Sequence, residues 1–280
     1  MRSRSHRSAV AAIVLSCAGA AALAQEDREG LFHWGHAAAF GSGVYALADE
    51  TEAQVVRLPF AKTLREPGAD RVGVRLLLPL TVGVQNLDEE QLEPGRPADE
   101  IEQAAFMPGV ELELSPLERV TLRVRGQAGW GKELEGVEDR ARLFSLGLRS
   151  RITWADAAGR PSLISGLQWA GSDPDEAERR ALIRLTKAVE FDIPVPRWEF
   201  RDETMHLKPH VLGDWFYRPP SALAFGDADS GHVATDWQVG LAAGRETGFE
   251  VLGFRLDSIG IAYRSSDHRY GIRIYIGSVF

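Results

Sequence analysis

The chain has 280 residues, of which 44% are hydrophobic, and its 32 Lys and Arg against 40 Asp and Glu give a formal net charge of −8 at pH 7. This acidic balance argues against a nucleic-acid-binding protein, which needs a basic face for the phosphate backbone. The single cysteine, Cys17, excludes an internal disulfide framework and any metal site built from several cysteines. The slightly negative mean hydropathy argues against a bundle of membrane-spanning helices. A β-barrel that alternates apolar and polar residues would have the same average.

The first 24 residues have the pattern of a secretory signal peptide. Arg2, Arg4 and Arg7 give it a basic start, residues 9–24 are small or apolar, and the stretch ends in Ala-Leu-Ala, a cleavage pattern. We therefore expect a signal peptide over residues 1–24. Its removal would leave 256 residues with 29 basic and 40 acidic side chains, a net charge of −11. The residues from Val14 to Cys17 also resemble a lipobox, so a lipidated Cys17 at the mature N-terminus stays open as an alternative.

From residue 38 onward the chain repeatedly alternates between apolar and polar residues. Such alternation runs through residues 71–85, 119–130 and 142–154, and it predicts strands with one apolar and one polar face. Strands of soluble proteins usually have about five to six residues. A tilted strand that crosses ~25 Å of hydrocarbon needs about 9–11. The length of the alternating segments therefore favours membrane-spanning strands.

The polar faces of these strands carry more charge than a dry protein core tolerates. We predict that they line a wet lumen, in which Glu111, Glu113 and Glu190 are the ion-pair partners of the arginines. The predicted lumen-facing polar residues are Arg75, Arg123, Arg125, Arg149, Arg151, His206, Lys208, His210 and Asp214. For the strand that carries the last four, this orientation requires Met205, Leu207, Val211 and Trp215 to face lipid.

The connections between the predicted strands alternate in length. Short ones are expected at 65–70, 115–118, 155–160, 192–197 and near 245–248, and longer ones at 86–104, 131–138, 171–178 and 219–233. This asymmetry is typical of outer-membrane barrels, which have tight periplasmic turns and longer external loops. Tryptophans near strand ends fit two aromatic girdles: Trp130, Trp169 and Trp215 on the long-loop side, Trp154 and Trp198 on the short-turn side.

The predicted fold class is therefore all-β, a transmembrane antiparallel up-and-down β-barrel over residues 38–280. A first strand at 38–48 and a last at 270–280 give twelve strands. A short periplasmic N-terminal segment is expected at 25–37. Ten or fourteen strands stay open for two reasons. The first segment is rich in Ala and Gly, and the apolar face shifts between Phe249 and Arg264. A bulge near Asp257 and Ser258, or two shorter segments, would produce that shift.

The end of the sequence resembles the β-signal by which the barrel-assembly machinery recognises outer-membrane proteins. Its physical sense is an exposed, β-prone edge that another strand can pair with during insertion. Ser278 departs from the pattern, which usually has a hydrophobic residue there. The residues that would form this assembly signal are Tyr270, Ile272, Ile274, Ile276 and Phe280.

Several segments together resemble a known family, the solitary outer-membrane autotransporter-like β-barrels. They are residues 40–49, 57–60, 252–263 and 270–273 together with the terminal Phe280. The resemblance would cover nearly all of the mature chain, and it implies a twelve-stranded barrel in an outer membrane. The chain differs from an autotransporter in that only residues 25–37 precede the predicted first strand, which leaves no room for a passenger. It implies little about activity.

We expect a protein of the Gram-negative outer membrane, with both barrel termini in the periplasm, that acts as a narrow pore or a structural barrel. Its expected partners are outer-membrane lipid, lipopolysaccharide and the barrel-assembly machinery, and neither nucleic acid nor a cofactor is implied. His206 and His210 lie about 13 Å apart along one strand, so they cannot share a metal without help from other strands. No serine can be assigned as a nucleophile for them, and we assign no catalytic residue. The alternatives are an outer-membrane lipid hydrolase with a lumenal or rim active site, and an exported soluble β-barrel that binds a ligand.

Overall fold

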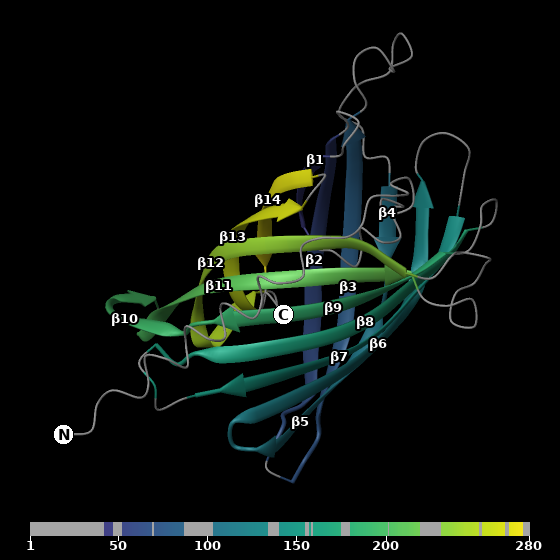
Figure 1. The fold of residues 1–280 in the computed structure, drawn as a ribbon. Helices are drawn as coiled ribbons and strands as arrows, with labels where there is room; N and C mark the ends of the chain where they lie inside the picture. Colours follow the sequence, from purple (N-terminus) through teal and green to yellow (C-terminus); the bar gives the residue numbers. More distant parts are fainter. Residues whose placement is uncertain are drawn as a thin grey trace.

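A computed structural model of the chain describes residues 42–46, 52–86 except 69, 103–133, 140–174 except 155, 156 and 158, 180–218 except 201, 231–251, 254–266 and 269–276. Within these ranges the chain forms one antiparallel sheet of fourteen strands and contains no helix (Figure 1). The prediction of an all-β, antiparallel fold is confirmed. Among the described residues no helix is long and apolar enough to cross a membrane.

The strands are long, and most have more than ten residues. Their bounds are β1 Gly43–Ala46, β2 Glu52–Arg65, β3 Gly73–Asn86, β4 Gln103–Phe106, β5 Gly109–Leu117, β6 Val120–Glu133, β7 Arg140–Thr153, β8 Ser162–Pro174, β9 Arg180–Glu190, β10 Ile193–Phe200, β11 Glu203–Arg218, β12 Gly231–Val251, β13 Phe254–Ser266 and β14 Arg269–Ile276.

Neighbours in the sheet are almost always neighbours in the chain. The strand order is β1-β2-β3-β4-β6-β7-β8-β9-β11-β12-β13-β14, with β5 beside β3 and β6, and β10 beside β11. β1 and β14, the two ends of this order, are in contact, and Figure 1 shows the purple and yellow strands next to each other. The described residues form no hydrogen-bonded ladder between these two strands.

β4 and β5 lie end to end between the same two neighbours. β4 pairs with Leu80–Gly83 of β3, and β5 pairs with Gly73–Leu77 of the same strand. Between them stands Pro108, which has no N–H to donate to a ladder. The backbone at this interruption lies very close to Gly129 of β6. A Cβ added at Gly129 would lie 1.9 Å from the carbonyl oxygen of Phe106. Glycine at that position therefore allows the interrupted strand to stay in the sheet.

The predicted turn at residues 192–197 is wrong, because these residues lie mostly in β10. That strand continues β9 along the edge of β11, pairing from Ile193 with Leu207 to Phe200 with Glu203. Two prolines, Pro194 and Pro196, lie within this strand. In the described part of the sheet, however, β10 pairs with β11 alone, and a strand with one free edge tolerates residues that lack an N–H.

The predicted turn near residues 245–248 is also wrong. β12 runs straight through these residues to Val251, and they form a bulge instead. Gly244 pairs with Ser258 and Phe249 pairs with Leu256, so four residues of β12 face the single residue Asp257. Gly248 has a φ of 77°, which few other residues adopt without strain. The irregularity expected near Asp257 is present, but its extra residues lie on β12. The other three predicted short connections lie at hairpin ends, whereas the predicted long connections fall largely outside the described residues.

The two faces of the sheet differ in composition, and the buried face is the polar one. On β13, Ile259 and Ile261 are 52% and 54% exposed, whereas Ser258 before them and Arg264 after them are 2% and 4% exposed. The same contrast holds on β12, where Val239 is exposed and Asp236 and Gln238 are buried. We call these two surfaces the apolar face and the polar face.

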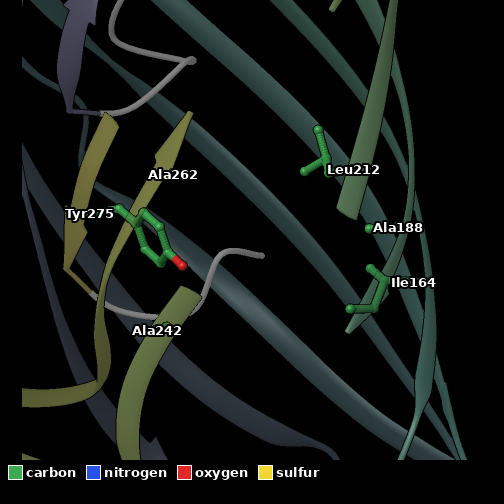
Figure 2. Close-up of a cluster of buried hydrophobic side chains, with 6 residues drawn as sticks. All are labelled: Ile164, Ala188, Leu212, Ala242, Ala262 and Tyr275. Carbon is green, nitrogen blue, oxygen red and sulfur yellow. The ribbon is translucent and has the colours of Figure 1, made fainter. Parts of the chain in front are cut away.

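A small apolar cluster also lies on the polar face (Figure 2). It consists of Ile164, Ala188, Leu212, Ala242, Ala262 and Tyr275. Figure 2 shows Tyr275 and Ala262 on one wall and Leu212, Ala188 and Ile164 on the wall opposite. Tyr275 reaches this position across Gly260, its pairing partner on β13, where a Cβ would lie 2.2 Å from the ring. The glycine thus provides the space into which the aromatic ring packs.

Candidate functional site

The strand register arranges the charged residues of the polar face in two adjacent rows that cross the sheet. Each row contains residues that are direct partners on successive strands. From β3 to β9 the first row is Arg75, Glu111, Arg125, Gly147, Gln168 and Arg184. From β5 to β12 the second row is Glu113, Arg123, Arg149, Gly166, Thr186, Asp214 and Asp236.

Carboxylates of β5 pair with arginines of both its neighbours. Arg75 of β3 lies 3.3 Å from Glu111, and Arg123 of β6 lies 2.7 Å from Glu113 and 4.0 Å from Glu111. Farther along the sheet, Arg151 donates to Glu190 over 2.9 Å. These three glutamates are the partners that the sequence analysis assigned to the arginines, and the structure brings each within ion-pairing distance of one of them.

Two glycines border a hollow among the arginines. Gly147 lies between Arg125 and Gln168 in the first row, and a Cβ there would meet the Nε of Arg125 at 3.0 Å, so the arginine lies across it. Gly166 lies between Arg149 and Thr186 in the second row. The hollow is open to solvent, and the space within it that the centre of a water molecule can reach is about 20 Å³. We call it the arginine pocket, and its charged and amide side chains are Glu111, Arg123, Arg125, Arg149, Gln168 and Arg184.

A second charged cluster adjoins the arginine pocket. Arg264 is 4% exposed and lies 2.6 Å from Asp236 and 3.4 Å from Asp214. Asp214 also lies 3.5 Å from Arg184, and it accepts a hydrogen bond from Thr186. The sequence analysis identified Asp214 but missed the other charged members of the cluster. The alternation that placed Asp214 would have identified them too, had it been extended to β9, β12 and β13.

The predicted histidines lie on the polar face but belong to different groups. His210, 2% exposed, lies 3.1 Å from the amide of Gln238, and its ring meets Tyr275 edge-on at 5.8 Å between centroids. His206 contacts Asp192 at 2.6 Å and Arg160 at 3.0 Å through Nδ1. Lys208, between the two histidines in the chain, is half-buried.

Among the residues that the structure describes, neither a metal-binding cluster nor a hydrogen-bonded serine accompanies these histidines. The described residues contain no group of three or more His, Cys, Asp or Glu that could hold a metal ion. In the described part of the chain, no serine hydroxyl is hydrogen-bonded to His206 or His210.

The predicted assembly-signal residues lie partly within β14. Ile272 and Ile274 are 53% and 59% exposed on the apolar face. Tyr270 and Ile276 belong to the same strand, whereas Phe280 lies outside the described residues. The predicted signal peptide over residues 1–24 and the segment 25–37 also lie outside them.

Comparison with known proteins adds no neighbour to this description. The chain matches no protein-family model, no curated protein and no solved structure. The chemistry of the site therefore rests on its own geometry, which is a concentration of guanidinium groups around a hollow on the polar face.

Proposed function

We propose that this chain is an integral β-barrel protein of a Gram-negative outer membrane, which acts as a narrow pore or a structural barrel. The observation that carries the proposal is the inverted polarity of the sheet. Charged side chains such as Asp236 and Arg264 are buried, while the large apolar side chains of the same strands are exposed. A water-soluble protein has the opposite arrangement.

The exposed apolar side chains would be costly in water. Burying a Leu or Ile side chain contributes about 1.5–3 kcal/mol, and β13 and β14 alone expose Ile259, Ile261, Ile272 and Ile274 by more than half. Contiguous apolar surfaces of this kind mark interaction or membrane surfaces in folded proteins. Contact with lipid hydrocarbon would remove these groups from water on all the strands that expose them.

The dimensions of the strands fit a bilayer. Arg142 of β7 pairs with Trp130, and Trp154 follows the other end of that strand. At ~3.3 Å per residue the path from Arg142 to Trp154 is about 40 Å long, which a strand tilt of ~40° would reduce to ~30 Å along the membrane normal. Trp130 and Trp154 are 66% and 38% exposed, as expected for side chains at the two edges of an apolar band.

We further propose that the sheet closes into a barrel with twelve strand positions. β4 with β5, and β9 with β10, each serve as one interrupted strand, which reduces fourteen segments to the twelve in the strand order. The contact between β1 and β14 supports closure. Membrane-spanning sheets must close, because an open edge leaves backbone groups without partners in lipid. Twelve positions also agree with the resemblance to autotransporter-like barrels.

Membrane fractionation with gel electrophoresis tests this proposal. We expect the expressed protein in the outer-membrane fraction, with faster mobility in SDS before boiling than after it, because an intact barrel resists SDS. Conductance of the purified protein in a planar bilayer then separates a pore from a closed structural barrel. Recovery in the soluble periplasmic fraction, with a single mobility, would contradict the proposal.

A further inference from the structure

We propose that the arginine pocket is a binding site for a phosphate-type oxyanion, which would make the interior of the barrel selective for anions. The selectivity rests on the proposed pore function, whereas the binding site rests on the pocket alone. The pocket lies on the polar face, where strands β6 to β9 run side by side.

The first support is the local excess of positive charge. Four guanidinium groups and one carboxylate line the pocket. Around that lining, Glu113 pairs with Arg123, and Asp214 lies near both Arg184 and Arg264. With Arg75 and Asp236 included, six arginines face four carboxylates over the two clusters. The two clusters together are thus net positive, although the whole chain has a net charge of −8.

The second support is the shape of the guanidinium group. Its N–H donors form a planar fork that matches two oxygens of a phosphate or carboxylate, so arginine binds oxyanions in a bidentate manner. Arg123 and Arg149 are direct cross-strand partners, and Arg125 lies two residues from Arg123 on the same face. The three arginines therefore come together from two adjacent strands. Like charges that lie directly opposite each other are destabilising, and ion pairing with carboxylates would not require Arg123 and Arg149 to be direct partners.

The third support is a buried polar group that borders the hollow and has bonding capacity to spare. Gly147 and Gly166 border the hollow, and the side chain of Arg125 lies over Gly147. Gln168, 7% exposed, donates through Nε2 to Ser145, and its Oε1 is a buried atom without a hydrogen-bond partner. This oxygen could accept from the hydroxyl of a monoprotonated phosphate. With the amide reversed, its NH₂ group would donate to phosphate oxygens instead.

Titration of the refolded full-length protein in detergent with inorganic phosphate tests the site. We expect saturable binding that Arg125→Gln and Arg149→Gln each weaken at least tenfold. Arg125→Lys should also weaken it, because it keeps the charge but not the fork. Arg142→Gln is the matched control: it removes an arginine of β7 on the apolar face, which is exposed, and should leave binding unchanged. Unheated gel mobility confirms that each variant is folded.

The source of the phosphate group is distinguished by a second ligand. Inorganic phosphate and glycerol phosphate are titrated in parallel: tighter binding of the first indicates a site for free phosphate, and tighter binding of the second indicates a site for the phosphoryl group of a larger solute. The absence of saturable binding by either, or equal weakening by Arg125→Gln and Arg142→Gln, would overturn the assignment.

Ion selectivity separates this inference from the proposed function. In a planar bilayer with a potassium phosphate gradient, the wild-type reversal potential should indicate anion preference. The Arg125→Gln/Arg149→Gln variant should lose that preference, and Arg142→Gln should keep it. A barrel that binds phosphate but does not conduct would refute the pore and retain the site. A barrel that conducts without anion preference and without phosphate binding would refute the site and retain the pore.

Discussion

Arg264 shows how single residues stabilise the polar face. Its guanidinium lies between Asp214 and Asp236, and all three residues are at most 4% exposed. Burial of such charges is tolerated only while each has a partner. The neighbouring Arg184 and Thr186 complete the partners of Asp214.

Arg264→Ala should therefore lower the free energy of unfolding by about 3–5 kcal/mol, because it leaves two buried carboxylates without their shared cation. The measurement is urea unfolding of the protein in lipid vesicles, followed by tryptophan fluorescence. Arg264→Lys keeps the charge and should lose less. A loss below about 1 kcal/mol for Arg264→Ala, within the range of ordinary surface substitutions, would show that the cluster does not depend on this cation.

The close contact between Gly260 and the ring of Tyr275 can be tested by adding a single methyl group. A Cβ at this position would lie 2.2 Å from the ring of Tyr275, whereas a Cβ at Gly126 would meet nothing within 4 Å. Gly260→Ala should cost about 1–3 kcal/mol of unfolding free energy, and Gly126→Ala should be neutral or slightly stabilising.

The reason for the difference is checked in a Tyr275→Ala background. There, Gly260→Ala should lose most of its effect, because the clash partner is absent and the two substitutions are then strongly non-additive. Equal effects of Gly260→Ala in both backgrounds would mean that the ring does not occupy this space.

The sequence predicted the charged residues of the site better than it predicted their contacts. Alternation assigned Arg123, Arg125 and Arg149 to one face, and the structure places them around a single hollow. It also placed Gly147 on that face, but it could not show that Gly147 and Gly166 border the hollow, because a glycine has no polarity and fits either face. It also could not show that Arg184 and Arg264 share Asp214, since such proximity depends on the register of strands that are far apart in sequence.

At the scale of the strands, arginine substitutions on the apolar face distinguish a membrane barrel from a soluble one. Ile261 lies in the middle of this strand and Leu117 at the end of β5, and both are more than half exposed. In water, an exposed Ile→Arg substitution usually changes stability by less than about 0.5 kcal/mol. In a bilayer, arginine costs ~2–4 kcal/mol at the midplane and ~0–1 kcal/mol near the interface.

Ile261→Arg should accordingly destabilise the protein in lipid vesicles by about 2–4 kcal/mol, and Leu117→Arg by no more than about 1 kcal/mol. Urea unfolding in vesicles measures both. Equal and negligible effects would indicate that the apolar face lies in water.

Strand existence was predictable, but strand ends were not. The period-two pattern predicted β3, β6 and β7 within a few residues, because each is long and lies between two partners. The pattern failed at β10 and β12. In β10 the prolines are compatible with a strand only because β10 pairs on one side. In β12 a four-residue bulge with Gly248 at positive φ looks like a turn when only the sequence is read. Both errors concern pairing partners, which local sequence does not contain.

At the scale of the whole molecule, the contact between the two ends of the sheet and the burial of its polar face have one explanation. The contact between β1 and β14 brings the ends of the strand order to each other, and the polar face is the buried one. A sheet that closes on a polar interior presents its apolar side chains outward, where contact with lipid makes that arrangement favourable. If the sheet closes as proposed, the arginine pocket and the Arg264 cluster belong to the interior of the barrel.

The accessibility of spin labels along β13 tests this account most directly. Single cysteines replace Ser258, Ile259, Ile261, Ala262, Tyr263 and Arg264 in turn, with Cys17 removed, and each labelled protein is refolded into lipid vesicles. The account predicts high collision rates with lipid-soluble oxygen at positions 259, 261 and 263 and low rates at 258, 262 and 264. High collision rates with a water-soluble nickel reagent at 259, 261 and 263 would contradict it, because the apolar face would then be in water.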